Sequence, residues 1–323
     1  ISMKVKVGKL VKNIIMMSMI GFVLSGTVMT VNAQNASENI EAESSGVVQE
    51  IPEGAVVIET EEVIEPLPVT EAVSGTYAGL SWTIENDTLT ITGSGEMEDA
   101  KKYNNNDNSY SIAYSNYPWS PYSYKKLVVG EGITNISKIA FCCRELESVS
   151  LPTTVTEIGY AAFYNCKALE SFIIPNSVTI IYSEAFSQSG LKEIEIPRNV
   201  KILHSEAFEG CTELKTVKLN GSFLEIRDET FKDCTSLTTV ILRDNAQYNI
   251  GKRAFQNCDS LSDLSWFSRV STIGQGAFEG CDGIEEINMP DTVDYIYSEA
   301  FANCSQLKKV NIGYNLKSIG KDA

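Results

Sequence analysis

The sequence predicts a solenoid built from turns of about 23 residues, with a stacked parallel β-sheet and a small β-rich N-terminal cap. Three observations support this fold class: a phenylalanine that returns at a nearly constant interval, an alternating apolar pair before each phenylalanine, and a hairpin pattern before the first turn. The spacings between the phenylalanines are 22, 23, 22, 23, 24, 23 and 23 residues. The repeated residues are Phe141, Phe163, Phe186, Phe208, Phe231, Phe255, Phe278 and Phe301.

Each turn, named here by its phenylalanine, carries a short strand pattern 14 to 12 residues before that phenylalanine. In the turns of Phe208 and Phe231 the apolar pairs are Ile194/Ile196 and Val217/Leu219. Such alternation is typical of a strand with one buried face. Pro197 follows the first pair, and a residue without an N–H ends the strand ladder there. One turn cannot bury its own apolar side chains, so neighbouring turns must stack to complete the core.

The repeat reads L-x-x-I-x-I-P-x-x-V-x-x-I-G-x-x-A-F-x-x-C, and it resembles the BspA-like leucine-rich repeats of bacterial surface proteins. The resemblance covers residues 127–323, as eight turns plus a truncated ninth. It implies a curved leucine-rich-repeat solenoid that serves adhesion or protein binding rather than catalysis. Two turns depart from the pattern. The turn of Phe255 has one extra residue, and the next has Trp266-Phe267 in place of an aliphatic residue and proline. We expect a local bulge at both places.

The chain is acidic, and its charge disfavours two classes of partner. It has 42 acidic and 26 basic residues, which give a formal net charge of −16. Four of the lysines lie in residues 1–33, which hold no acidic residue, so removal of that segment leaves −16 − 4 = −20. A surface of this sign repels nucleic acid and anionic lipid. Nucleic acid is therefore not expected as a partner.

Residues 1–33 have the features of a secretory signal peptide. Four lysines precede an apolar run from 14 to 31, and Val31-Asn32-Ala33 offers small residues for cleavage. We expect cleavage after Ala33, and hence a secreted or cell-surface protein. The alternative is an uncleaved anchor, since the run is about long enough to cross a membrane. Membrane contact is expected only in that case.

A linker and a cap are predicted between the signal peptide and the solenoid. Residues 34–74 are rich in glutamate and hold no lysine or arginine, which predicts a disordered acidic linker. Residues 75–126 begin with two alternating strands around Asn86-Asp87, a hairpin pattern. This region resembles the amino-terminal module that often precedes BspA-like repeats. Its aromatic residues are expected to pack inside a cap that covers the solenoid end, and a sugar-stacking platform is the alternative. These residues are Tyr110, Tyr114, Tyr117, Trp119, Tyr122 and Tyr124.

The cysteines and the single histidine are the residues in which chemistry could be sought. Most cysteines stand three residues after a repeat phenylalanine, and equivalent side chains in a ladder point the same way rather than at each other. We expect free, buried thiols. His204 is expected to be exposed and without a catalytic partner. The chain shows no metal-ligand spacing and no nucleophile motif, so no catalytic, cofactor or metal site is predicted.

The candidate binding residues lie on the outward face of the predicted sheet. The residue between the two buried ones of each strand must point away from the core. In the central turns this face carries two isoleucines, which an idle solvated face would not need. We therefore expect a partner-binding patch, and the alternative is a face without function. The patch residues are Ile173, Glu195, Lys218 and Ile241, with Glu193 and Thr216 two positions earlier on the same face.

These observations together favour a non-catalytic protein-binding or adhesion module that acts through the concave sheet. The expected partner is a protein of a host or neighbouring cell surface, and the expected state is a monomer. A different class of function is the non-catalytic portion of a larger cell-wall or glycan-active enzyme, with the aromatic cap binding carbohydrate. A purely structural spacer is a third reading. The first rests on resemblance at the level of the fold.

Overall fold

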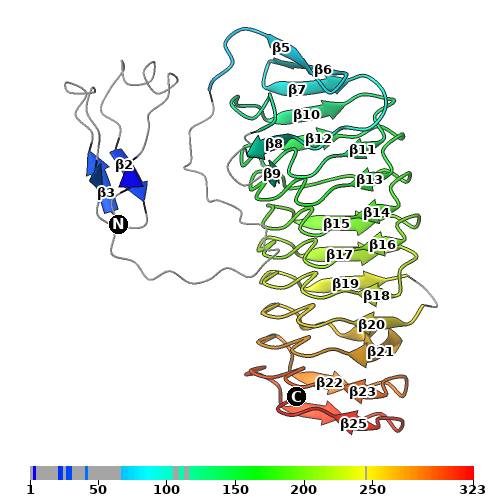
Figure 1. The fold of residues 1–323 in the computed structure, drawn as a ribbon. Helices are drawn as coiled ribbons and strands as arrows, with labels where there is room; N and C mark the ends of the chain where they lie inside the picture. The colour runs from blue at the N-terminus through cyan, green and yellow to red at the C-terminus, as the bar shows by residue number, and fades with distance from the viewer. Residues whose placement is uncertain are drawn as a thin grey trace. The chain divides into compact units, whose positions relative to one another are not determined.

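In the computed structural model the chain forms two compact units, Ile1–Glu59 and Thr60–Ala323, and the second contains the solenoid (Figure 1). The structure describes residues 67–323 except 105–108, 113–115 and 244–245, together with four short strands in the first unit. For those four strands and for β8 and β9 it describes the backbone alone.

The first unit contains two antiparallel strand pairs. β1 (Met3–Lys4) pairs with β4 (Glu41–Ala42), and β2 (Gly21–Leu24) pairs with β3 (Thr27–Thr30). Apart from these strands, the predicted signal peptide lies outside the described residues, and so does the predicted acidic linker as far as residue 66. Both remain predictions.

The solenoid stacks its turns as two columns of short parallel strands (Figure 1). The first column is the predicted sheet and consists of β10 (Lys126–Val129), β12 (Ser148–Ser150), β15 (Glu193–Ile196), β17 (Thr216–Leu219), β19 (Thr239–Leu242), β22 (Glu286–Asn288) and β24 (Lys309–Asn311). The second column consists of β11 (Asn135–Ile136), β13 (Glu157–Ile158), β14 (Ile180–Ile181), β16 (Ile202–Leu203), β18 (Glu225–Ile226), β20 (Tyr248–Ile250), β21 (Val270–Ile273), β23 (Tyr295–Ile296) and β25 (Ser318–Ile319). The predicted solenoid with a stacked parallel sheet is therefore confirmed, and the second column is an addition to it.

Prolines follow three strands of the first column, Pro197 directly and Pro152 and Pro290 one residue further on, whereas the turn that contains Pro175 forms no strand there. Pro197 follows β15 directly, and its carbonyl accepts a hydrogen bond from the Val200 N–H at 3.1 Å. The carbonyls of Pro152, Pro175 and Pro290 accept in the same way from the valine three residues later. Each proline thus closes a reverse turn that leads the chain from the first column toward the second.

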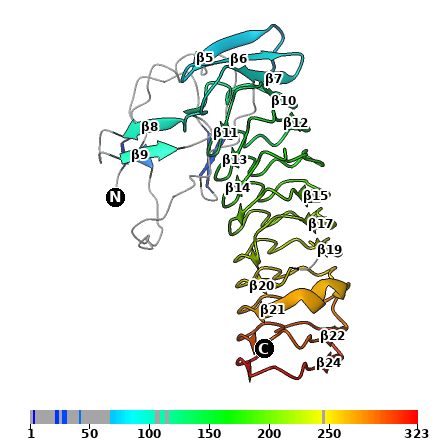
Figure 2. The same cartoon turned by 90° about the vertical axis from the view of Figure 1, so that its right-hand side faces the viewer.

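The two departures from the repeat have different outcomes. β19 keeps its register with β17 through Leu242, so the extra residue falls after the strand. The irregularity shows instead between Tyr248 and Asn249, where β20 pairs with β21. In the next turn the prediction of a bulge is wrong, because a 3₁₀-helix, η3 (Ser265–Arg269), replaces the strand (Figure 2). Trp266 and Phe267 are both buried, and neighbouring residues of a strand point to opposite faces. A helical turn lets both rings face the core.

The repeat phenylalanines form one continuous stack through the solenoid. Neighbouring rings lie 5.3–5.7 Å apart between centroids, with planes inclined by at most 22°. All eight side chains are buried. The stack extends into the cap, where the Trp119 ring lies 5.8 Å from the Phe141 ring. The inward register predicted from the period is therefore confirmed.

The cap is a β-sheet that joins the first column. β5 (Val73–Tyr77), β6 (Leu80–Glu85) and β7 (Thr88–Thr92) pair in antiparallel fashion, and β7 pairs in parallel with β10. Asn86 and Asp87 connect β6 to β7 with φ values of 50° and 58°, the left-handed conformation of a type I′ hairpin turn. A second hairpin is formed by β8 (Lys101–Asn104) and β9 (Ser109–Ile112). The predicted hairpin is confirmed.

The cap begins earlier in the chain than predicted. The Leu67 N–H donates to the Pro121 carbonyl at 2.9 Å, and the Ser123 N–H donates to the Leu67 carbonyl at 3.0 Å. Strand β5 then starts at Val73. Residues 67–74 therefore belong to the cap rather than to the linker. Their single charge, Glu71, let them resemble the acidic segment that precedes them.

The central aromatic side chains of the cap are packed inside it. Tyr117, Trp119 and Tyr124 are at most 1% exposed, and the Trp119 indole N–H donates to the Ala140 carbonyl at 2.9 Å. Tyr122 is half-buried with its ring 6.1 Å from that of Trp82. The prediction of cap packing is confirmed for these residues, and a sugar-stacking platform on Trp119 is wrong. The side chains of Tyr110 and Tyr114 lie outside the described residues.

Candidate functional site

The predicted patch lies on the outward face of the first column. The strand register aligns Glu195 of β15 with Lys218 of β17 and with Ile241 of β19. Ile173 lies one turn before β15, in a segment that forms no strand, and 85% of its surface is exposed. Ile241 is 44% exposed. These four residues, called the outer row below, therefore point away from the core as predicted.

The centre of the outer row is an ion pair between neighbouring turns. The Lys218 Nζ lies 3.6 Å from Glu195 Oε2, and the Asn220 amide donates to Glu195 Oε1 at 3.0 Å. Exposed pairs of this kind contribute roughly 0–1 kcal/mol to stability. The two charges thus neutralise each other at the surface, and an isoleucine remains on each side of them. Glu193 and Thr216 lie two positions earlier in the same strands and are aligned with each other. Glu193 is exposed and Thr216 is half-buried.

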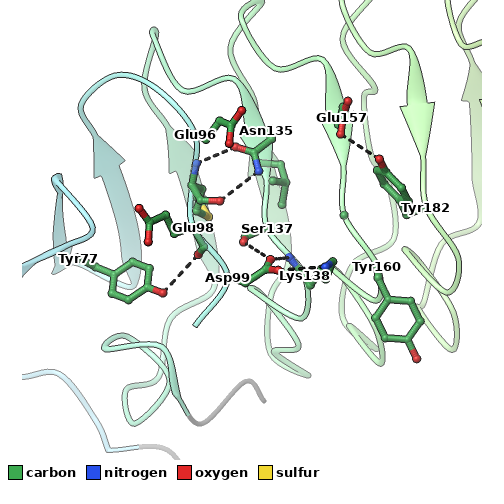
Figure 3. Close-up of a pocket in the computed structure, with 13 residues that line it drawn as sticks. Tyr77, Glu96, Glu98, Asp99, Asn135, Ser137, Lys138, Glu157, Tyr160 and Tyr182 are labelled. Atoms are coloured by element: carbon green, nitrogen blue, oxygen red, sulfur yellow. Dashed lines mark hydrogen bonds and ion pairs between the residues drawn. The ribbon is translucent and has the colours of Figure 1, made fainter. Parts of the chain in front are cut away.

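A groove lies where the cap meets the second column (Figure 3). Its volume is about 640 Å³. Tyr77 and residues 96–99 of the cap form one wall, and residues of the first three turns form the other. The Asn135 side chain ties the walls together, because it accepts from the Met97 N–H at 2.7 Å and donates to the Met97 carbonyl at 3.1 Å. No motif in the sequence indicated this site, since its residues come from separate segments.

The groove is lined by carboxylates and tyrosines. Asp99 accepts hydrogen bonds from the Ser137 hydroxyl at 2.9 Å and from the Lys138 N–H at 3.2 Å, and the Lys138 Nζ lies 3.1 Å from it. Although partial burial opposes ionisation, these contacts hold the pKa of Asp99 below its usual value. The Tyr182 hydroxyl donates to Glu157 at 3.2 Å. Within the described part of the chain, no lysine or arginine pairs with Glu96, Glu98 or Glu157.

The repeat cysteines are free thiols, as predicted, and they also act as hydrogen-bond donors. Each Sγ donates to the carbonyl of the phenylalanine in an adjacent preceding turn, at 3.0–3.2 Å. Burial raises the pKa of the Cys211 thiol to about 11, so it stays protonated at neutral pH. Each of these carbonyls also accepts a hydrogen bond from a backbone N–H of its own turn, so the thiol is its second donor and contributes more than its small apolar volume. The members of this column are Cys166, Cys211, Cys234, Cys258, Cys281 and Cys304.

We predict that an alkylating reagent labels none of the fully buried column thiols in the native protein and all of them after unfolding. Cys166, Cys211, Cys234, Cys258 and Cys281 are 0% exposed, whereas Cys304 is half-buried and provides an internal control for slow labelling. Mass spectrometry of the alkylated peptides measures the result. Labelling of Cys211 in the native protein, or a disulfide between neighbouring turns, would contradict this arrangement.

His204 is less exposed than predicted. Its ring is half-buried and stacks on Tyr182 with centroids 5.2 Å apart and planes inclined by 6°. Its Nδ1 lies 3.3 Å from the Arg227 Nη1. Burial and the neighbouring guanidinium lower the pKa of His204, so the imidazole is neutral at pH 7. The prediction of an exposed side chain is wrong, because the ring fills the space between neighbouring turns.

Neither a metal-binding cluster nor a membrane-spanning helix is present in the described residues. Among them, no group of three or more histidine, cysteine, aspartate or glutamate side chains is placed to hold a metal ion. Nor does that part of the chain contain a helix of the length and hydropathy required to cross a membrane.

Comparisons with solved structures find other leucine-rich repeat proteins. One from T. pallidum is 24% identical with a TM-score of 0.45. The match covers 58% of this chain and 91% of the T. pallidum protein. A leucine rich cell surface protein from Faecalibacterium prausnitzii is 18% identical with a TM-score of 0.34. The match covers 77% of this chain and 94% of that protein. The pneumococcal vaccine antigen PcpA is 15% identical with a TM-score of 0.28. The match covers 77% of this chain and 88% of PcpA. No curated protein matches the chain.

A family model identifies the repeats. The model of the BspA type leucine rich repeat region, in six copies, matches residues 134–248 and 224–323. These matches reach from the first turn to the last described residue and cover more than half of the chain. They include the phenylalanine stack, the cysteine column and the outer row. The chain therefore belongs to the BspA type leucine-rich repeat family.

Proposed function

We propose that this protein is a non-catalytic binding module of the bacterial cell surface, and that its outer row docks on a protein partner. The observation that carries the proposal is the exposure of Ile173 and Ile241 on the outward side of the first column, where the inward residues are buried. Secretion by the predicted signal peptide would bring this face into contact with proteins of a host or a neighbouring cell.

The composition of the outer row supports a protein partner. Burying an isoleucine side chain is worth about 1.5–3 kcal/mol, so two of them suffice for a measurable share of an interface. The Lys218–Glu195 pair between them offers a donor and an acceptor at fixed positions, which favours one orientation of the partner. An interface with an apolar contact on each side of a polar centre would use all four residues.

We expect the double substitution Ile173→Ser and Ile241→Ser to weaken partner binding at least tenfold, a loss of about 1.4 kcal/mol or more. The melting temperature should stay nearly unchanged, because both side chains are exposed in the free protein. Binding is measured by titrating extracellular-matrix proteins and purified surface proteins of neighbouring cells onto the immobilised full chain. Undiminished binding by this variant would show that the recognition surface lies elsewhere.

A matched control removes two exposed apolar side chains outside the outer row. Leu224→Ser and Tyr295→Ser serve this purpose, since these residues are 53% and 44% exposed. This control should bind as the unmodified protein does. A fall in the stability of the outer-row variant, with binding retained, would mean that the isoleucines belong to the core.

The alternative, the non-catalytic portion of a larger cell-wall or glycan-active enzyme, stays a prediction. Its carbohydrate-binding element cannot be the Trp119 ring, which is fully buried.

A further inference from the structure

The groove between the cap and the second column is a second candidate interaction surface, and it is separate from the outer row. Its lining comes from the cap and from the second-column side of the turns, whereas the outer row belongs to the first column. Its volume of about 640 Å³ lies within the range of pockets that bind small molecules or side chains.

The walls of the groove are held in place before any partner arrives. Asn135 bonds both the N–H and the carbonyl of Met97, and Asp99 bonds the Ser137 hydroxyl and the Lys138 N–H. On the opposite wall, Gly159 lets two turns approach closely, since a Cβ at that position would lie 2.6 Å from the Ile136 carbonyl oxygen. The groove thus requires little ordering on binding.

The charge of the described groove lining is negative and mostly uncompensated. Lys138 is the only cation among the described lining residues, and its ammonium is paired with Asp99 (Figure 3). The carboxylates of Glu96, Glu98 and Glu157 remain without a cationic partner in the described part of the chain. Burial together with the charges of Glu98 and Asp99 raises the pKa of Tyr77. This shift agrees with a negative potential inside the groove.

Aromatic rings complete the lining. Tyr77 stands on the cap wall and Tyr160 and Tyr182 stand on the solenoid wall (Figure 3). All three are half-buried, and their hydroxyls donate to Glu98 O at 3.3 Å, to Glu184 at 2.7 Å and to Glu157 at 3.2 Å. These bonds leave the rings as the apolar part of the walls. A guanidinium or ammonium group is attracted both by carboxylates and by aromatic faces, and its alkyl stem packs on the same rings.

We propose that the groove binds arginine and lysine side chains of a basic segment in a partner protein. Charge complementarity selects this occupant, because three carboxylates without a cationic partner among the described residues repel anionic ligands and gain little from neutral ones. Arginine fits better than lysine, since its planar guanidinium bonds a carboxylate through two N–H groups and stacks on tyrosine. This surface would act alongside the outer row and does not depend on it.

The test is a titration of the full chain with a fluorescent tetra-arginine peptide, compared with a tetra-citrulline peptide of the same shape and no charge. We expect tetra-arginine to bind at least tenfold more tightly than tetra-citrulline, with affinity falling as salt rises. Glu96→Gln, Glu98→Gln and Glu157→Gln together should weaken tetra-arginine binding at least tenfold. The charge-reversing variant Glu96→Lys, at an exposed position, should weaken it in the same direction.

A charge-matched control separates the groove from the general acidity of the chain. Glu170→Gln, Glu213→Gln and Glu285→Gln remove three exposed carboxylates outside the groove and should leave the affinity within twofold. The Ile173→Ser/Ile241→Ser variant should also bind the peptide normally, so failure of the outer-row proposal would be distinguishable. Equal losses in the groove and control variants, or equal binding of both peptides, would overturn the proposal. Displacement of tetra-arginine by chitotetraose would also overturn it, in favour of a glycan site.

Discussion

Replacing Phe208 with alanine is expected to lower the free energy of unfolding by about 3–5 kcal/mol. The side chain is fully buried, and its ring stacks on Phe186 at 5.3 Å and on Phe231 at 5.5 Å. Alanine would leave a cavity bounded by rings that stacking fixes on both sides, so the site can collapse only partly. Urea denaturation followed by far-UV circular dichroism measures the loss.

The loss should be local, because each turn of a solenoid contacts only its neighbours. Hydrogen exchange should show reduced protection in the turns of Phe186, Phe208 and Phe231 and unchanged protection in the cap. Lys201→Ala, at an exposed position of the same turn, should change stability by less than about 0.5 kcal/mol. A loss below about 1 kcal/mol for Phe208→Ala would mean that the inward register described above is incorrect.

Trp119→Ala is expected to destabilise the cap and the first turn by about 3–5 kcal/mol. Its ring stacks on Phe141 at 5.8 Å and on Tyr117 at 5.0 Å, and it meets Tyr77 edge-on at 5.8 Å. Its indole N–H also donates to the Ala140 carbonyl at 2.9 Å, so the substitution leaves that carbonyl without this donor. Hydrogen exchange over residues 73–141 is the measurement.

Trp119→Phe separates packing from hydrogen bonding at this position. Phenylalanine keeps an aromatic ring in the stack but removes the N–H, so the expected loss is about 1–3 kcal/mol. Equal protection of the cap amides in the alanine variant and the unmodified protein would contradict the view that Trp119 joins the cap to the solenoid. Reduced protection confined to the distant turn of Phe278 would contradict it as well.

Features that repeat with the period of the chain could be predicted from the sequence alone. Phe208 and its equivalents recur with the same apolar neighbours, and a stacked arrangement is what buries them all. The same argument placed Glu195 and Lys218 outward, because strand residues alternate between faces. The Asn86-Asp87 turn was also predictable, since that dipeptide between alternating strands favours a type I′ turn.

Features that depend on neighbours from other turns were decided only by the tertiary structure. A strand of two residues such as β13 has too little alternation to be recognised, and it exists because β11 and β14 pair with it. η3 replaces a strand because the core accepts both Trp266 and Phe267. His204 is half-buried because stacking sets Tyr182 against one face of its ring and brings the Arg227 guanidinium to its Nδ1.

The same division holds for the candidate sites. The outer row follows from the period, so the sequence alone predicts which of its side chains are exposed. The groove required the cap to dock on the second column, which brings Tyr77, Glu98, Asn135 and Tyr182 together from four separate segments. The thiol–carbonyl bonds of the cysteine column likewise join residues 25–27 positions apart. The physical reason is that a repeat pattern specifies which side of the chain is buried, whereas contacts between turns depend on how the turns are stacked.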